Sequence, residues 1–96
     1  MSVYVIAQIS IHDRDSYDKY QSRFLDVFKK FDGKLLAADE NPQIVEGEWQ
    51  HKKVILMQFP GEDAFREWAF SEEYQEIAKD RKAGADGTVL LVKSFG

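Results

Sequence analysis

The residues of this chain that suit small-molecule chemistry are aromatic rings and one arginine. Large rings combined with a few polar groups are typical of pockets for planar or hydrophobic molecules. Arg81 lies one helical turn from Ile77 and Ala78, so its guanidinium is a candidate anchor for a ligand carboxylate. Core packing explains each ring equally well, and pairing with an acid at a helix end explains Arg81. The candidate ligand-binding residues are Tyr20, Phe24, Trp49, Phe59, Trp68, Tyr74 and Arg81.

A smaller set of residues is suited to catalysis without a cofactor. Tyr20 and Arg81 could orient a substrate, and His51 could transfer a proton. His51 falls in a polar turn, however, where a histidine is usually solvated. The two histidines show no metal-ligand spacing, and the sequence contains no phosphate-binding glycine loop and no nucleophile elbow. We therefore expect neither a metal site nor a bound cofactor.

Length and charge exclude several classes of protein. The chain has 96 residues, so residues 1–96 are expected to form one domain. The net charge is −4 and no stripe of Lys or Arg is present, which argues against binding to nucleic acid or to an anionic membrane. The absence of cysteine excludes disulfide scaffolds and thiolate sites. The N-terminal segment has no signal-peptide pattern, so we expect a cytoplasmic protein.

Hydrophobic periodicity predicts the elements that must position these residues. Alternating side chains predict strands over residues 3–11, 53–59 and 88–95. A further strand over residues 34–39 is interrupted by turn residues 40–42 and continues over 43–49, where Gly47 marks a bulge or a close approach. A helix with an aromatic face is predicted from the Asp13–Asp15 caps to Gly33, and a second from residue 62, broken at Ser71. Residues 83–87 are expected to be a flexible connection. The sequence therefore predicts an α+β, ferredoxin-like βαββαβ fold with a four-stranded antiparallel sheet and its first and third strands in the middle.

One face of the predicted sheet has no helix to cover it, yet it is apolar. A monomer would need polar residues there, and a patch of this size rarely stays in water. We therefore expect a homodimer in which two such sheets face one another. The apolar residues of this face are Tyr4, Ile6, Val54, Leu56, Leu90 and Val92.

Nearly the whole chain resembles the family known as domain of unknown function 1330, of the dimeric α+β-barrel superfamily. The matching segments are YVIA from Tyr4, DSYDKY ending at Tyr20, GKLL from Gly33, EGEW ending at Trp49, VILMQFP from Val54, SEEY ending at Tyr74, and the isolated residues Ala64, Trp68 and Arg81. Their order and spacing carry the resemblance, and no single motif does. The resemblance implies a dimer with a pocket between sheet and helices, but it implies no established reaction.

Three functions are compatible with these observations. The first is a homodimer that binds a small hydrophobic or aromatic molecule between sheet and helices. The second is a cofactor-free enzyme, similar to a monooxygenase or an isomerase, acting on an aromatic or polyketide-like substrate; this rests on analogy within the superfamily. The third is a purely structural or regulatory dimer whose interior is filled by side chains. A cavity with converging polar groups would favour the first two.

Overall fold

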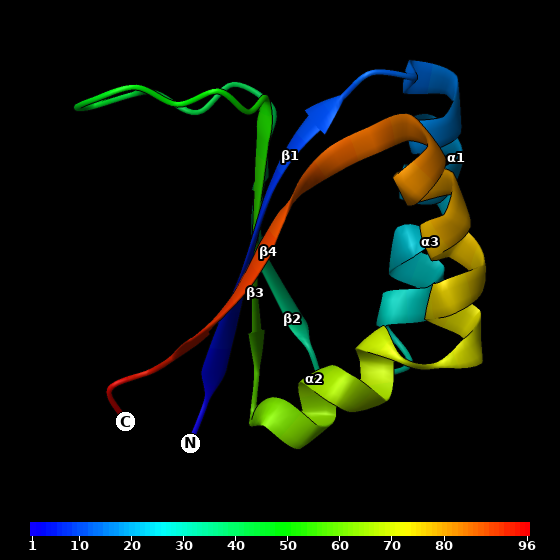
Figure 1. Ribbon diagram of the computed structural model, residues 1–96. Helices are drawn as coiled ribbons and strands as arrows, with labels where there is room; N and C mark the ends of the chain where they lie inside the picture. The colour runs from blue at the N-terminus through cyan, green and yellow to red at the C-terminus, as the bar shows by residue number, and fades with distance from the viewer.

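Seven elements follow one another in the computed structural model, which describes residues 1–96. They are β1 (Val3–Ile11), α1 (Arg14–Phe28), β2 (Lys34–Asp39), β3 (Lys53–Phe59), α2 (Glu62–Ala69), α3 (Glu72–Gly84) and β4 (Ala85–Lys93). The sheet has the strand order β2-β3-β1-β4, and every neighbouring pair is antiparallel. The three helices lie on one side of the sheet (Figure 1). The predicted α+β, βαββαβ fold is thus confirmed, including the break in the second helix and the central pair β1 and β3.

Local sequence explains where the helices begin. The Asp13 carboxylate accepts a hydrogen bond from the Ser16 backbone N–H at 3.3 Å, which caps α1. The Ser71 hydroxyl does the same for the Tyr74 N–H at 3.1 Å, which ends α2 and starts α3. Helix α1 ends at Phe28, earlier than the expected limit at Gly33.

The core lies between the inner face of the sheet and an aromatic stripe of α1. Side chains of a strand alternate between its two faces, and in β1 and β3 every second residue is buried against the helices. The buried residues of α1 recur at helical spacing. They are Tyr17, Tyr20, Phe24 and Phe28, and they pack on Val3, Val5, Ala7 and Ile9 of β1 and on Ile55, Met57 and Phe59 of β3.

The predicted strand over residues 43–49 is wrong. Residues 40–52 leave the sheet after β2 and form an extended arm that projects away from the helices before the chain returns to β3 (Figure 1). Val45 is 91% exposed, so the apolar residues that suggested a strand here have no core to enter. Gly47 has φ +85° with open space around it, so it serves a turn in the arm rather than a bulge or a close approach.

The predicted flexible connection over residues 83–87 is also wrong. Helix α3 continues through Gly84, and β4 begins at the next residue. The Gly84 carbonyl accepts hydrogen bonds from the backbone N–H groups of His12 and Asp13 at 2.9 and 3.0 Å. A Cβ atom at Gly84 would lie 2.6 Å from the Asp13 carbonyl oxygen, so only glycine allows this approach.

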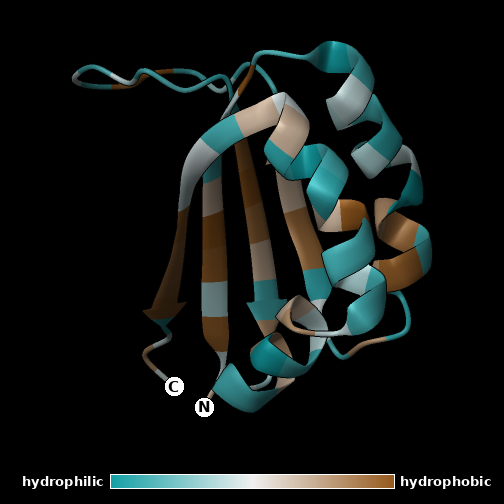
Figure 2. Cartoon of the chain, turned by 45° about the vertical axis from the view of Figure 1, so that its right-hand side comes forward, coloured by the Kyte–Doolittle hydropathy of each residue, from teal (hydrophilic) through white to brown (hydrophobic).

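The opposite side of the sheet, which we call the outer face, carries no helix. It is formed by alternate residues of the strands, among them Ile6 and Leu56, which pair across β1 and β3. Leu90 and Val92 remain 44% and 42% exposed on β4. Figure 2 shows hydrophobic segments along the strands, in contrast to the hydrophilic colouring of much of the helices. None of the three helices combines the length and the apolarity needed to cross a bilayer.

Candidate functional site

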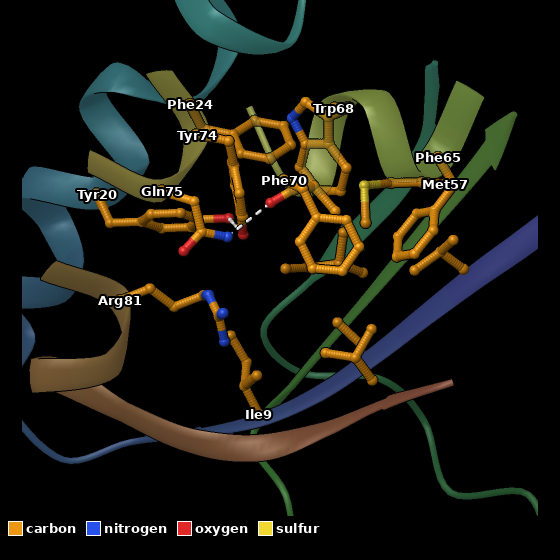
Figure 3. A pocket seen from close by; sticks show the side chains of 15 residues that line it. Ile9, Tyr20, Phe24, Met57, Phe65, Trp68, Phe70, Tyr74, Gln75 and Arg81 are labelled. Atoms are coloured by element: carbon orange, nitrogen blue, oxygen red, sulfur yellow. Dashed lines mark hydrogen bonds between the residues drawn. The ribbon is translucent and has the colours of Figure 1, made fainter. Parts of the chain in front are cut away.

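A cavity of about 230 Å³ lies between the inner face of the sheet and the three helices (Figure 3). Alternate residues of β1 and β3 form its floor, because strand alternation directs them toward the helices. Helix α1 contributes Tyr20 and Phe24, which are four residues apart and therefore share one helical face. Of the 15 residues that line the cavity, 13 are hydrophobic. This is the composition expected of a small-molecule pocket.

Trp68 of α2 is the central ring of the cavity wall. Its ring lies 4.2 Å from that of Tyr74, measured between centroids, and 5.5 Å from that of Phe59, on which it stacks. Phe28 meets it edge to face at 5.3 Å. Stacked and edge-to-face contacts of this kind favour one orientation of the Trp68 ring. The Trp68 indole Nε1–H is buried and has no hydrogen-bond acceptor.

The polar groups of the cavity come from α1 and α3. The hydroxyl oxygens of Tyr20 and Tyr74 are 3.0 Å apart. Burial, reinforced by Tyr74, raises the pKa of Tyr20 well above its ordinary value, so this hydroxyl is neutral near pH 7. The Gln75 side-chain amide is already engaged, because its Nε2 donates to the Ala69 carbonyl at 2.7 Å. The Arg81 Nε is buried without a hydrogen-bond partner, and the side chain points toward Ile9 on one side of the cavity (Figure 3).

The structure brings together five of the seven candidate ligand-binding residues. Tyr20, Phe24, Trp68, Tyr74 and Arg81 all line the cavity. Phe59 does not: it is 1% exposed and lies in the core, where it supports Trp68 from behind. Phe59 does face the helices, as the alternation of β3 predicts, but the aromatic rings packed on it separate it from the cavity.

Trp49 and His51 are separated from the cavity by the sheet. The Trp49 indole Nε1 donates to the Gln8 side-chain oxygen at 2.9 Å, and His51 Nδ1 lies 3.2 Å from the Ser10 hydroxyl. Gln8 and Ser10 belong to the outer face, because they alternate with buried Ala7 and Ile9 along β1. The base of the arm therefore folds onto the outer face. Of the three catalytic candidates, only Tyr20 and Arg81 share the cavity.

Sequence reasoning missed a second cavity, of about 250 Å³, beside the first. Tyr20, Phe24 and Ile55 line both cavities and so form the partition between them. Its polar group is Lys53, which is 5% exposed, and burial lowers the pKa of its ammonium. Lys53 Nζ donates to the Gln21 side-chain oxygen at 3.1 Å. The sequence did indicate that Lys53 faces inward. It lies two residues before Ile55, so strand alternation places both side chains on the inner side of β3.

Comparison with known proteins places this chain in a family. The sequence matches the family described as Domain of unknown function (DUF1330) over residues 2–95. The chain belongs to this family. That description carries no reaction and no ligand, as the resemblance in the sequence implied. No curated protein matches the chain.

Solved structures share the fold of this DUF1330 member at low sequence identity. The RPA0582 protein of unknown function from Rhodopseudomonas palustris is 18% identical, with a TM-score of 0.82 over 99% of this chain and 83% of that one. SnoaB, a cofactor-independent oxygenase from Streptomyces nogalater, is 11% identical, with a TM-score of 0.68 over 99% and 94%. A dimeric ferredoxin-like protein of unknown function from Thermobifida fusca is 13% identical, with a TM-score of 0.68 over 98% and 92%.

Proposed function

We propose that this DUF1330 protein is a homodimer that binds a small hydrophobic or aromatic molecule in the cavity between sheet and helices. The observation that carries the proposal is the cavity itself, with its aromatic walls and the Arg81 side chain among its lining residues. An apolar cavity of about 150 Å³ suffices for benzene. The larger volume here suits a molecule of one or two rings.

Binding is favoured over the other two functions by the arrangement of the polar groups. A purely structural dimer would have its interior filled by side chains. A proton-transfer enzyme would need a group that titrates near neutral pH beside the substrate. Within one chain, His51 lies on the other side of the sheet, and the Tyr20 hydroxyl has a raised pKa. The oxygenase activity of SnoaB belongs to a protein that shares the fold alone, and a shared fold does not carry an activity with it.

The homodimer is supported by the outer face. Ile6, Leu56 and Leu90 lie side by side on β1, β3 and β4, and no helix covers them. Burying such a patch against a second copy removes apolar surface from water. Two of the proteins that share this fold are described as dimeric.

Sedimentation equilibrium tests the dimer. We expect a species of about twice the 11.1 kDa chain mass at micromolar concentration. Leu90→Arg should shift the mass toward the monomer, because the charge would be buried in the interface. Leu25→Arg replaces a leucine on α1, away from the outer face, that is 60% exposed against 44% for Leu90, and it should leave the dimer intact. An 11 kDa species for the unmodified chain would overturn this part of the proposal.

Tryptophan fluorescence tests ligand binding directly. The chain has two tryptophans, on opposite sides of the sheet, so Trp49→Phe leaves Trp68 as a reporter inside the cavity. Titration of this variant with 2-naphthoate and with 2-naphthamide should give a saturable change with at least one of them. Trp68→Phe, which keeps only Trp49, should respond little. No saturable response of Trp68 to either compound would overturn the proposed binding function.

A further inference from the structure

The cavity is polar at one end and apolar at the other. Figure 3 shows Tyr20, Gln75 and Arg81 on one side of the space, and Met57 and Phe65 on the opposite side. Because the sheet floor is apolar throughout, the helices alone create this difference. A ligand that fits both ends must therefore be amphipathic, with its polar group at the end formed by α1 and α3.

The polar end carries a positive charge that no acid of the protein neutralises. The eight salt bridges of the chain involve other cations, and none includes Arg81. Its Nε–H is also without a hydrogen-bond acceptor inside the protein. A guanidinium offers five donors and no acceptor, and its planar fork matches a carboxylate. Arg81 is thus available to an anionic acceptor from outside the chain.

The neighbouring tyrosines add a donor and no negative charge. One hydroxyl of the Tyr20–Tyr74 pair donates to the other, so the second O–H of the pair is not used between them. Neither hydroxyl has another hydrogen bond within the protein. Gln75 donates from Nε2 to a backbone carbonyl, and its side-chain oxygen is an acceptor at this end. Donors therefore predominate at this end, and an oxygen anion satisfies donors where a cation or a neutral hydrocarbon would not.

We propose that the ligand is a small aromatic acid, whose rings occupy the apolar end and whose carboxylate is bound by Arg81 with a hydroxyl of the Tyr20–Tyr74 pair. This inference rests on the proposed binding function and names its ligand class. The charge of the ligand supplies the missing counter-ion, and its rings pack against Trp68 and Phe65. A carboxylate offers two oxygens and a negative charge to the planar guanidinium fork, whereas an amide offers one neutral oxygen, so the acid should be preferred over its neutral analogue.

The ligand has an entrance at the junction of α2 and α3. Phe70 follows α2 and lines the cavity, although 67% of its surface is exposed. Val89, on the edge strand β4, also lines the cavity and is 50% exposed. Residues that are both lining and exposed mark the mouth of the cavity. Gln75, at the polar end, is exposed as well, so the mouth extends to that end of the cavity.

Calorimetry with a matched pair of ligands tests the inference. The pair is 2-naphthoate and 2-naphthamide, which have the same rings but differ in charge. We expect the unmodified protein to bind the acid at least about tenfold more tightly than the amide. Arg81→Gln should remove that preference, weakening the acid about tenfold and changing the amide little. Lys82→Gln, which removes the adjacent but exposed cation, should leave both affinities unchanged.

Each outcome decides a separate question. Equal binding of acid and amide to the unmodified protein would overturn the aromatic-acid inference and leave the proposed binding function standing. Binding of neither compound would overturn both. If Arg81→Gln fails to fold, the comparison of the two ligands on the unmodified protein still decides the inference. An acid preference that survives in folded Arg81→Gln would also contradict the assignment to Arg81.

Discussion

The hydroxyl oxygens of Tyr20 on α1 and Tyr74 on α3 lie 3.0 Å apart, although the two residues are separated by 54 positions. Both side chains are buried, with exposed fractions of 4% and 7%. This hydrogen bond joins the two helices that form the polar end of the cavity. It therefore links the stability of the helical layer to the geometry of the proposed ligand site.

Removing both hydroxyls of this pair should cost less stability than the sum of the two single removals. Tyr20→Phe leaves the Tyr74 hydroxyl buried without its partner, a loss of about 1–3 kcal/mol in the free energy of unfolding. Tyr74→Phe should cost a similar amount. The double variant leaves no unpaired group, so its loss should be clearly smaller than the sum of the two. Urea denaturation of the four proteins measures this, and strict additivity would show that the two hydroxyls do not interact.

Stability should fall in alkaline solution because of buried tyrosines. Burial raises the pKa of Tyr17 to about 12 and raises that of Tyr20 as well. Above pH 10 the unfolded chain releases protons that the folded chain keeps, so the free energy of unfolding decreases with pH. The slope is up to about 1.4 kcal/mol per pH unit for each such tyrosine, and the stabilising effect is complete below pH 10.

Denaturant unfolding at pH 8 to 11 and constant ionic strength checks this dependence. Tyr17→Phe is a suitable control, because the Tyr17 hydroxyl is buried and has no hydrogen-bond partner to lose. This variant should be about as stable as the unmodified protein at pH 8 and should lose less stability at pH 11. Identical pH curves for the two proteins would contradict the assignment to Tyr17.

Gly84→Ala should strongly destabilise the fold. The new Cβ would lie 2.6 Å from the Asp13 carbonyl oxygen and 2.7 Å from the Tyr17 backbone nitrogen, and neither atom can move without shifting the start of α1. We expect a loss above about 2 kcal/mol. Gly47→Ala is the comparison: its φ is positive but its surroundings are open, so local strain of about 1–2 kcal/mol is the only cost. Thermal unfolding that ranks Gly47→Ala as the more damaging change would refute this account.

Lys53→Met should be tolerated despite the burial of the lysine. The Lys53 ammonium lies 4.0 Å from a Glu40 carboxylate oxygen and 4.9 Å from the centre of the Tyr17 ring. Burial lowers its pKa, which means that the folded state disfavours the charge. A methionine of similar length avoids that penalty, so the free energy of unfolding should change by less than about 1 kcal/mol or increase. Chemical denaturation measures it, with exposed Lys52→Met as the reference; a loss above about 3 kcal/mol would show that the ion contacts are needed.

The alternation of apolar residues along the strands and the capping residues of the helices made most of the fold predictable. The buried positions of β1, the aromatic face of α1 and the caps at Asp13 and Ser71 are local properties, and each appears in the structure where the sequence indicated it. The arm was missed because the pattern around Val45 resembles a strand, whereas a strand also requires a partner that only the fold can supply. The short step from α3 to β4 was missed because Gly84 suggested freedom, while it actually permits close packing against α1.

The sequence indicated which face of each helix points at the sheet, but it did not indicate which of the candidate residues reach the cavity. Tyr20, Phe24 and Tyr74 line the cavity because their helical faces point at the sheet, which periodicity indicates. Trp49 was grouped with them because the segment around it was predicted to be a strand beside the pocket. Its Nε1–H instead binds Gln8 on the outer face, a long-range contact that no local pattern encodes.

Filling the cavity tests the binding function most directly. Ala69 of α2 lines the cavity, whereas Ala64 of the same helix does not, so Ala69→Leu and Ala64→Leu form a matched pair. Calorimetric titration with 2-naphthoate should give saturable binding at one site per chain in the unmodified protein. Ala69→Leu should weaken this binding at least about tenfold, and Ala64→Leu should leave it nearly unchanged. Undiminished binding to Ala69→Leu, or no binding to the unmodified protein, would contradict the proposed site.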